Sequence, residues 1–307
     1  LRDKYGIPIS KLLAMLVRPS ITAAEGKTLV WGDWSAIEAR ILAWISGSRS
    51  AQKVVLDVFE AVDADPSLPD LYVQTAQAIF GHDNITDKER QAGKVAVLAL
   101  GFGGAVGAYR AMSQGYGMQI DDEQAKRIVD GWRDHNRWAK AFWFTLWDAA
   151  VNAINNPGSR YSAGKVDYLF VPGLMHGTLL CFLPCGRPLA YPGARYEESY
   201  DEESNRVRKK LTFDSGGGRF DTWYGKLAEN VTQAAAASLL RAALRELNGR
   251  AEVVMHTHDE IVCECDEKDA PRVRKILQEV MTTRPEWAEG LPLSAEIKDS
   301  WYYTKGV

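Results

Sequence analysis

Apolar and polar positions along the chain predict strands near both ends and a mostly helical middle. Residues 28–31, Thr-Leu-Val-Trp, form a short apolar run that predicts a buried strand, with Asp33 just beyond it. Apolar residues then recur at helical spacing, which predicts a helix over about 35–45 that ends at Gly47. The chain is therefore expected to open with a strand and a helix.

The middle of the chain continues the helical pattern after a polar stretch. Residues 57–69 are polar and contain two prolines, which predicts a connector. Thr86 and Glu89 stand at the spacing of a capping box, so a helix is predicted to begin at about Asp87 and to end in the glycines of 101–104. The predicted helices span about 71–80, 87–100, 122–138 and 139–153.

The pattern changes after Pro157, where short β-like runs alternate with turn signals. An alanine-rich segment over 226–247 has strong helix propensity. Residues 253–265 are β-rich and are interrupted by the polar run 257–260, which predicts a hairpin. The fold class expected from these patterns is α+β.

Composition and charge add limits to this picture. The 307 residues are 46% hydrophobic and 25% charged, which is enough to bury a substantial core. The net charge of −3 means that any nucleic-acid surface must be a local patch, and basic clusters at 206–210 and at Arg241 with Arg245 indicate only a solvated face by themselves. Four cysteines are too few for a disulfide framework, so a reducing compartment is expected. No apolar run approaches the ~20 residues that span a bilayer.

Two acidic residues, Asp33 and Asp259, stand where a predicted strand gives way to a turn. Carboxylates are the hard oxygen ligands that Mg²⁺ prefers, and two of them converging on two ions suit nucleotidyl transfer. A single aspartate at a strand end is more often a helix cap or a turn residue. The residues around each aspartate must decide between these interpretations.

Three segments resemble the motifs of polymerase I-like, or A-family, DNA polymerases. Residues 32–40, GDWSAIEAR, resemble the first motif, Asp-Tyr-Ser-x-Ile-Glu-x-Arg. Residues 255–262, MHTHDEIV, resemble the third motif, whose core is His-Asp-Glu between two strands. Arg90, Lys94 and the run Gly-Phe-Gly at 101–103 lie between them and resemble the middle motif of the fingers helix. Three motifs in the family's order are a specific signal.

The resemblance implies a right-hand polymerase palm, built as an antiparallel sheet with helices, and a mainly helical fingers subdomain. The first part of the palm would span 1–60, the fingers 61–180, and the second part of the palm, with the His-Asp-Glu hairpin, 181–307. Only 32 residues precede Asp33, so no thumb or exonuclease domain is expected within this chain.

The activity that the resemblance implies is template-directed DNA synthesis by a two-metal mechanism, with transfer of deoxynucleotidyl units to a primer 3′-hydroxyl. Asp33 and Asp259 would bind two Mg²⁺ ions, or Mn²⁺, with the backbone carbonyl of Trp34 as a further ligand. Glu260 is expected to point to the opposite side of the strand from Asp259 and to have a supporting catalytic role.

The fingers helix would bind the incoming nucleotide. Arg90, Lys94 and Leu98 are four residues apart and therefore share one helix face. By the resemblance, Arg90 contacts the β and γ phosphates and Lys94 the α or β phosphate. Glu38 resembles the residue that blocks a ribose 2′-hydroxyl, and Phe102 belongs to the same nucleotide site.

Three further residues are assigned to DNA by the resemblance. His258 would contact the primer terminus, Gln233 the template, and Arg187 lies in a segment that resembles a palm strand. The expected partners are primer–template DNA, dNTPs and a separate chain that supplies a thumb or processivity function. No membrane partner is expected, and the expected location is the cytoplasm of a bacterium or of a phage-infected host.

Several residues depart from the family's pattern. Leu98 stands where the family usually has Phe or Tyr, and Phe102 replaces a Tyr whose hydroxyl commonly pairs with the gating glutamate. Glu229 occupies a position where an Asn is expected, four residues before Gln233. These differences indicate a divergent branch, such as that of a phage or prophage.

Two alternatives remain open at this point. The order His256, His258, Asp259 also begins some zinc sites, which would make the protein a metallohydrolase. Such a site needs additional ligands, and the other histidines are His82, His135 and His176. The second alternative is a catalytically weak nucleic-acid-binding remnant or fragment of a polymerase that keeps the motifs.

Overall fold

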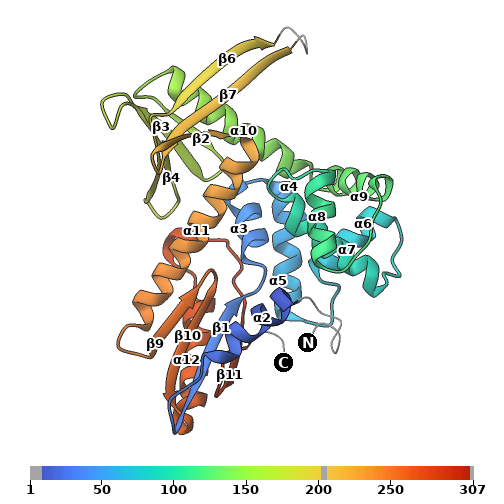
Figure 1. Cartoon of the computed structure of the whole chain (residues 1–307), viewed down its shortest axis with the longest axis vertical. Coiled ribbons are helices and arrows are strands. Elements are labelled where there is room, and N and C mark those ends of the chain that lie inside the picture. Colours follow the sequence, from blue (N-terminus) through green and yellow to red (C-terminus); the bar gives the residue numbers. More distant parts are fainter. Residues whose placement is uncertain (1–8, 202–205, 305–307) are drawn as a thin grey trace. The chain divides into compact units, whose positions relative to one another are not determined.

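The computed structural model describes residues 9–201 and 206–304, and the chain divides into two compact units (Figure 1). Unit 1 comprises Leu1–Ile37, Ala237–Glu286 and Leu293–Val307, and unit 2 comprises Glu38–Ala236 and Trp287–Pro292. Both units combine helices with antiparallel sheets, as expected for an α+β protein. The predicted bounds of palm and fingers stay a prediction.

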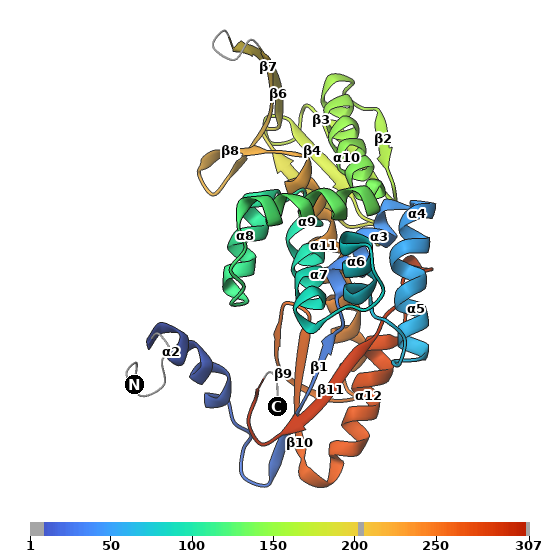
Figure 2. The same cartoon turned by 90° about the vertical axis from the view of Figure 1, so that its right-hand side faces the viewer.

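A four-stranded antiparallel sheet forms the centre of unit 1, with strand order β11-β1-β10-β9. Helix α12, Ala270–Thr282, packs along β1 and β11 (Figures 1 and 2). The strands are β1 (Lys27–Trp34), β9 (Glu252–Thr257), β10 (Glu260–Asp266) and β11 (Ala295–Ser300). The predicted strand at 28–31 and the predicted hairpin at 253–265 are therefore confirmed.

The face of β1 toward α12 requires a glycine. A Cβ on Gly32 would clash with the Sδ atom of Met281 and with the side chain of Ile297. The absence of a side chain allows α12 to approach the strand closely, and the indole Nε1 of Trp34 donates a hydrogen bond of 2.6 Å to the Met281 carbonyl. The end of β1 is therefore fixed against α12.

The opposite face of the sheet carries a second apolar cluster. Leu29, Trp31, Val262 and Tyr303 are buried there. Tyr303 comes from the segment after β11, and its backbone N–H donates to the Ile21 carbonyl at 2.9 Å. The segments before β1 and after β11 thus cover the same face of the sheet.

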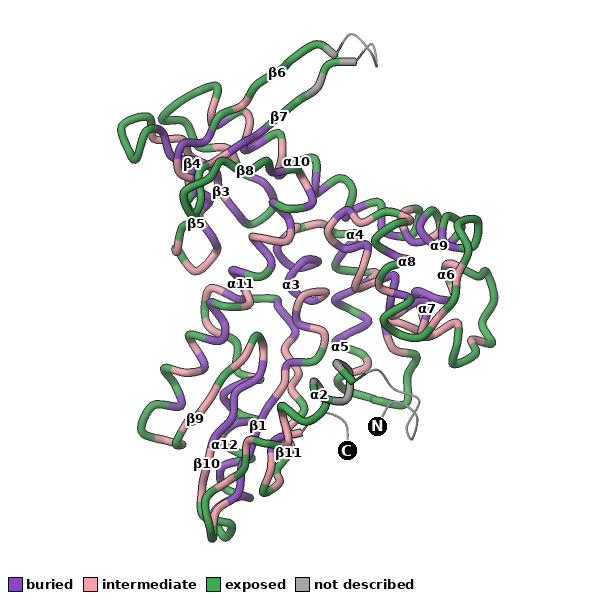
Figure 3. Tube along the Cα trace, viewed as in Figure 1, coloured by how far each residue is buried: buried purple, intermediate pink, exposed green. Residues whose placement is uncertain are grey.

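Unit 2 contains most of the described helices, and two of them, α6 and α7, pack closely against each other. Gly93 lies where a Cβ would clash with the carbonyl oxygen of Tyr72, so α6 and α7 approach each other at backbone distance. The helices of this unit are α3 (Ile37–Ser46, beginning at the boundary), α4 (Arg49–Ala51), α5 (Asp57–Ala64), α6 (Leu71–Phe80), α7 (Asp87–Leu100), α8 (Val106–Gly115), α9 (Asp122–His135) and α10 (Arg137–Asn155). Figure 3 shows that α3 is buried along most of its length, as its apolar spacing predicts.

One sequence interpretation in this region is wrong. Residues 57–69 were expected to be a connector, but α5 occupies the first part of this stretch. Val58 and Phe59 are buried, and the guanidinium of Arg40 lies 4.0 Å from the centre of the Phe59 ring. The tertiary packing of these two residues outweighs the polar composition around them. Helix α8 was also not predicted.

Two antiparallel sheets follow α10 in unit 2, and α10 packs against β2 and β3 (Figure 1). The short strands predicted after Pro157 are thereby confirmed. The first sheet contains β2 (Arg160–Ala163), β3 (Val166–Val171), β4 (Thr178–Phe182) and β5 (Pro188–Pro192), and the second contains β6 (Arg195–Asp201), β7 (Arg206–Ser215) and β8 (Gly218–Thr222). On β7, Lys209 pairs with Glu198 at 3.6 Å, which fits the interpretation of a solvated charged face.

The alanine-rich segment forms α11, Tyr224–Leu247, which begins in unit 2 and ends in unit 1. Helix α2, Ile9–Val17, precedes β1 in the chain and belongs to unit 1. The remaining short helical segments are Arg18–Ser20, Gln52–Leu56, Glu267–Asp269 and Glu286–Ala288. Over the described part of the chain, none of the helices combines the length and apolar character that crossing a membrane requires. The four cysteines lie within the described residues and form no disulfide with one another.

Candidate active site

Asp33 and Asp259 lie at the same end of the unit 1 sheet. Asp33 is on β1, and Asp259 is the second residue of the two-residue loop that joins β9 to β10. The backbone N–H of Trp34 donates to the carbonyl of Asp259 at 3.3 Å. Both aspartates are half-buried. The tertiary structure therefore brings the two predicted carboxylates to neighbouring backbone positions.

The loop that carries Asp259 has an unusual backbone. His258 adopts φ +48°, in the left-handed region that non-glycine residues rarely occupy. A two-residue hairpin loop needs a positive φ because only then does its twist match that of the strands. The side chain of His258 is exposed. The chain thus keeps a histidine at a position where glycine would relieve strain.

Glu260 is only 3% exposed and is held by two other side chains. The Nη1 and Nη2 atoms of Arg18 lie 3.2 Å from Oε1 and 3.0 Å from Oε2 of Glu260. The hydroxyl of Tyr303 donates to Oε2 at 2.6 Å and accepts from Nη1 of Arg18 at 2.8 Å. These contacts use both oxygens of the carboxylate.

The electrostatics of this group are consistent with its hydrogen bonds. Burial opposes the charge on Arg18, but the hydrogen bond and the charge of Glu260 outweigh it and raise the pKa of the guanidinium. Burial, followed by the hydrogen bond to Glu260, raises the pKa of Tyr303. The tyrosine therefore remains a neutral hydroxyl that donates to a paired carboxylate.

The strand register assigns Glu260 to a side of the sheet. Asp33 pairs directly with Glu260 between β1 and β10. Residues directly opposite each other in antiparallel strands project from the same face. Glu260 therefore lies on the same face as Asp33, next to the segment that contains Arg18.

The donor set at this end of the sheet suits a hard cation. Mg²⁺ is commonly held by one or two carboxylates together with substrate phosphates, so Asp33 and Asp259 fit such an ion. Within residues 9–201 and 206–304, no group of three or more His, Cys, Asp or Glu side chains is arranged to hold a metal. The zinc site suggested by His256, His258 and Asp259 therefore lacks a ligand set in the described part of the chain.

In unit 2, the predicted phosphate-binding residues lie on α7. Arg90 forms an ion pair with Asp70, and its Nε donates to Oδ2 of Asp70 at 3.1 Å. Lys94 lies one turn further on, with its Nζ 5.8 Å from the ring centres of Tyr72 and Tyr116. The shared face expected from the spacing is present, but Arg90 already has a carboxylate partner.

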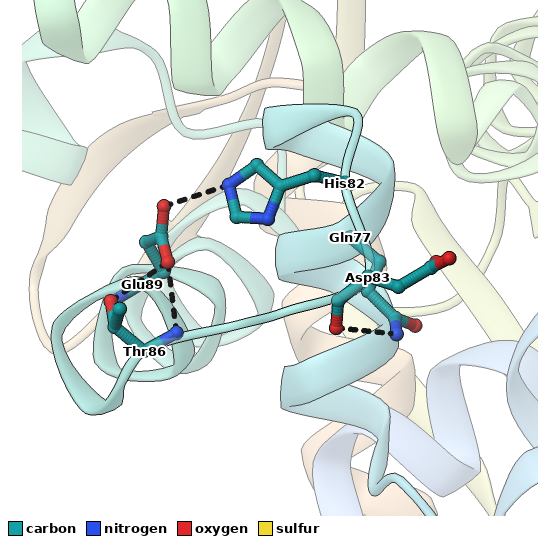
Figure 4. Close-up of polar contacts among 5 residues, drawn as sticks. All are labelled: Gln77, His82, Asp83, Thr86 and Glu89. Carbon is teal, nitrogen blue, oxygen red and sulfur yellow. Dashed lines mark hydrogen bonds and ion pairs between the residues drawn. The ribbon is translucent and has the colours of Figure 1, made fainter.

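The start of α7 is fixed by its own capping groups, which Figure 4 shows. The hydroxyl of Thr86 accepts from the Glu89 N–H at 3.3 Å, and Oε2 of Glu89 accepts from the Thr86 N–H at 2.9 Å. His82 lies 3.0 Å from the other carboxylate oxygen of Glu89. Hydrogen bonds from Thr86, first from its backbone N–H, lower the pKa of Glu89. The predicted capping box is confirmed.

The end of α7 packs tightly against the start of α11. The Nε1 of Trp143 donates to the Gly101 carbonyl at 2.8 Å. Gly103 has φ +78°, and a Cβ there would lie 2.9 Å from the Trp223 ring. Leu98 and Phe102 are both half-buried. The close approach of the Trp223 ring explains the glycine at position 103.

Glu38, predicted to block a ribose 2′-hydroxyl, contacts Gln233, predicted to contact the template, within unit 2. The Nε2 of Gln233, on α11, donates to Oε1 of Glu38, on α3, at 3.2 Å. One residue further on, the Ala234 carbonyl accepts from Nη2 of Arg187 at 2.7 Å. Arg187 therefore supports the backbone of α11 beside Gln233.

The sequence interpretation missed three residues that contact the predicted site residues. Arg18 and Tyr303 bind Glu260, and Asp70 binds Arg90. Asp70 was recognisable as an N-cap candidate before Leu71, but nothing local indicated that it pairs with a residue 20 positions away. No sequence signal relates Arg18 to a glutamate 242 positions away.

Comparisons with known proteins agree with the motifs. The chain is 34% identical over 305 residues to the DNA polymerase of Bacillus phage SP02, an alignment that covers 96% of this chain and 44% of that protein. It is 25% identical over 299 residues to the thermostable DNA polymerase I of Thermus filiformis, covering 95% of this chain and 29% of that protein. The chain therefore spans less than half the length of these curated relatives. No protein-family model matches it.

A solved structure shares the fold. The POL domain of Pol1 from M. smegmatis, determined in complex with a DNA primer–template and dNTP, superposes with a TM-score of 0.60. The superposition covers 96% of this chain and 44% of that chain at 18% sequence identity. A likeness at this identity establishes the architecture, and the chemistry must be argued from the residues.

Proposed function

We propose that this chain, a relative of the polymerase I-like DNA polymerases that shares their palm and fingers architecture, is the catalytic portion of a template-directed DNA polymerase. The observation that carries the proposal is that Asp33 and Asp259 lie at the same end of one sheet. Each aspartate lies in a segment that resembles a polymerase motif, and the Trp34 N–H is hydrogen-bonded to the Asp259 carbonyl at 3.3 Å.

Asp33 and Asp259 would bind two Mg²⁺ ions, with the Trp34 carbonyl as a further ligand. When bound, such ions would activate the primer 3′-hydroxyl and neutralise charge on the triphosphate. The task of the protein is to hold the two carboxylates at a fixed separation. Trp34 contributes to it, because its indole is bonded to α12 and its backbone to the Asp259 loop.

Arg90 and Lys94 would bind the triphosphate of the incoming dNTP. Guanidinium and ammonium groups one turn apart on a helix match phosphate oxygens along a chain of phosphates. Because Asp70 accepts from Arg90, triphosphate binding would exchange one anionic partner for another. Asp70 would thereby compete with the triphosphate for Arg90.

Glu38 would exclude ribonucleotides by occupying the space of a 2′-hydroxyl. The family's usual tyrosine hydroxyl is missing at Phe102, and Gln233 donates to the Glu38 carboxylate instead. Gln233 would therefore both orient Glu38 and contact the template. His258 would approach the primer terminus from the exposed hairpin loop, and Arg187 would hold α11 in place beside the DNA.

The decisive test is primer extension with Mg²⁺ and dNTPs, comparing the unmodified chain with Asp259→Asn. We expect the variant to lose activity by about 10³-fold or more, equivalent to about 4 kcal/mol of transition-state stabilisation. Asp266→Asn is the matched control, because Asp266 is an exposed carboxylate at the other end of β10. Absence of extension by the unmodified chain at every concentration would favour the catalytically weak remnant.

A further inference from the structure

We propose that Arg18 and Tyr303 are positioning residues that bind both oxygens of Glu260 and thereby fix the loop that carries Asp259. The proposal rests on the proposed function and adds two residues to it. It also assigns Glu260 a role as an anchor of the loop in place of a metal ligand.

Glu260 has no exposed side for a metal. Its carboxylate is 3% exposed and receives donors on both oxygens, from Nη1 and Nη2 of Arg18 and from the Tyr303 hydroxyl. A buried carboxylate is stable only when it is paired and hydrogen-bonded, and this one is both. A metal would have to displace at least one of these donors.

Glu260 is also linked directly to Asp259 through the backbone. Glu260 is the first residue of β10 and directly follows Asp259, and it pairs with Thr257 across the two-residue loop. Its side chain is therefore the anchor nearest to the carboxylate that is proposed to bind metal. If Glu260 moves, Asp259 moves with it, because a loop of two residues cannot absorb the displacement.

The charge of Arg18 matters at this end of the sheet. Asp33, Asp259 and Glu260 place three acidic side chains around one end of the sheet, and Asp33 lies opposite Glu260 in the register. Arg18 pairs with Glu260 and offsets its negative charge beside Asp33 and Asp259. Without Arg18, the third charge would be buried beside the other two and would push the strand ends apart.

The two donors, Arg18 and Tyr303, are themselves firmly held. Tyr303 packs edge-on against Trp31, with ring centres 5.6 Å apart, and the Arg18 guanidinium lies 4.8 Å from the centre of the Tyr303 ring. Backbone hydrogen bonds join the segment that follows Arg18 to the segment that contains Tyr303. They run from Ala23 N–H to the Trp301 carbonyl at 2.8 Å and from Tyr303 N–H to the Ile21 carbonyl. Each donor thus arrives on a segment that the sheet supports.

The test is Mn²⁺ binding, measured from the electron paramagnetic resonance signal of the free ion. We expect Arg18→Ala to weaken Mn²⁺ binding about tenfold or more, since residues that orient a metal site without binding the ion typically contribute 10–100-fold to its affinity. Tyr303→Phe should have a smaller effect in the same direction. Because both donors act on Glu260, the double variant should lose less than the product of the two single effects.

A matched control separates positioning from a general loss of charge. Arg274 pairs with Asp299 at 2.6 Å in the same unit, so Arg274→Ala removes an arginine from a comparable ion pair. We expect this variant to bind Mn²⁺ as tightly as the unmodified chain. Guanidinium ion at millimolar concentration should restore binding to Arg18→Ala, because the Arg18 side chain is 34% exposed and its site is open to solvent.

Two results would overturn the proposal. One is an affinity of folded Arg18→Ala within twofold of the unmodified chain, with folding checked by circular dichroism. The other is loss of one bound ion in Glu260→Gln, which would make Glu260 a ligand. If Arg18→Ala does not fold, Mn²⁺ binding is measured in Arg18→Lys and Tyr303→Phe instead. Unchanged affinity in both variants would also overturn the proposal. Mn²⁺ binding is measured without DNA synthesis, so failure of the polymerase assay leaves this test intact.

Discussion

At the scale of single residues, two features of the candidate site are not required by the fold: the backbone conformation of His258 and the hydrogen bond between Glu38 and Gln233. His258 occupies a left-handed backbone conformation at φ +48° and is exposed. Glu38 meets Gln233 at 3.2 Å on the surface of unit 2. Backbone strain of the kind seen at His258 concentrates at functional sites. Both features lead to predictions that separate function from stability.

Replacing His258 by glycine should change the free energy of unfolding by no more than about 1 kcal/mol. Relief of the left-handed strain, about 1–2 kcal/mol, offsets the greater entropy that glycine gives the unfolded chain. His256→Gly, at an extended position of β9, should instead destabilise by about 1 kcal/mol. Urea unfolding measures both variants. Primer extension by His258→Gly should show a raised KM for primer–template, and an unchanged KM would remove His258 from the DNA site.

Glu38→Ala should lower the preference for deoxynucleotides over ribonucleotides by about tenfold or more, because the 2′-hydroxyl is no longer blocked. Gln233→Ala should lower it less, by about three- to tenfold, since one exposed hydrogen bond contributes about 0.5–1.5 kcal/mol. The measurement is the ratio of kcat/KM for the two nucleotide classes. Glu229→Ala, on the same helix, should leave the ratio unchanged. If Gln233→Ala also leaves it unchanged, Gln233 does not orient Glu38.

At the scale of elements, α7 is fixed at both ends and close-packed in its middle. Its capping box fixes the start, the glycine-rich turn fixes the end, and Gly93 brings it against α6. The same contact region places Asp70, the N-cap of α6, beside Arg90. The position of the proposed phosphate-binding face therefore depends on the packing of two helices.

Asp70→Asn should lower the KM for dNTP by a few-fold. The substitution removes the negative charge that holds Arg90, while asparagine caps a helix as well as aspartate does, so stability should change by less than about 1 kcal/mol. Asp121→Asn is the control, because Asp121 caps α9 in the same way. Steady-state kinetics with varied dNTP distinguishes the two variants. A raised KM in Asp70→Asn would mean that Asp70 helps to orient Arg90 in the bound state.

Gly93→Ala should destabilise the protein by about 2 kcal/mol or more, because the added methyl group overlaps the Tyr72 carbonyl and forces α6 and α7 apart. Gly107→Ala, in α8, has open space around the added Cβ and should stabilise by up to about 1 kcal/mol through helix propensity. Thermal unfolding of the two variants provides the comparison. Equal effects would contradict the close approach of α6 and α7.

At the scale of the whole molecule, the sequence predicted local elements well and long-range partners poorly. The capping box at Thr86, the helix at 71–80 and the hairpin around Asp259 all depend on residues close in sequence, and all three are confirmed. The connector expected at 57–69 is wrong because α5 is stabilised by packing of Val58 and Phe59 that composition does not reveal. Helix periodicity is a local property, whereas burial depends on the rest of the fold.

By itself the sequence was enough to propose which residues carry the chemistry, because the motifs around Asp33, Arg90 and Asp259 are short and ordered along the chain. Only the tertiary structure decided what surrounds them. Arg18 contacts Glu260, 242 positions away, and Tyr303, 285 positions away. Neither contact is indicated by a local sequence pattern. The physical reason is that a buried carboxylate requires donors from any segment that folding brings near it, and sequence spacing does not encode that proximity.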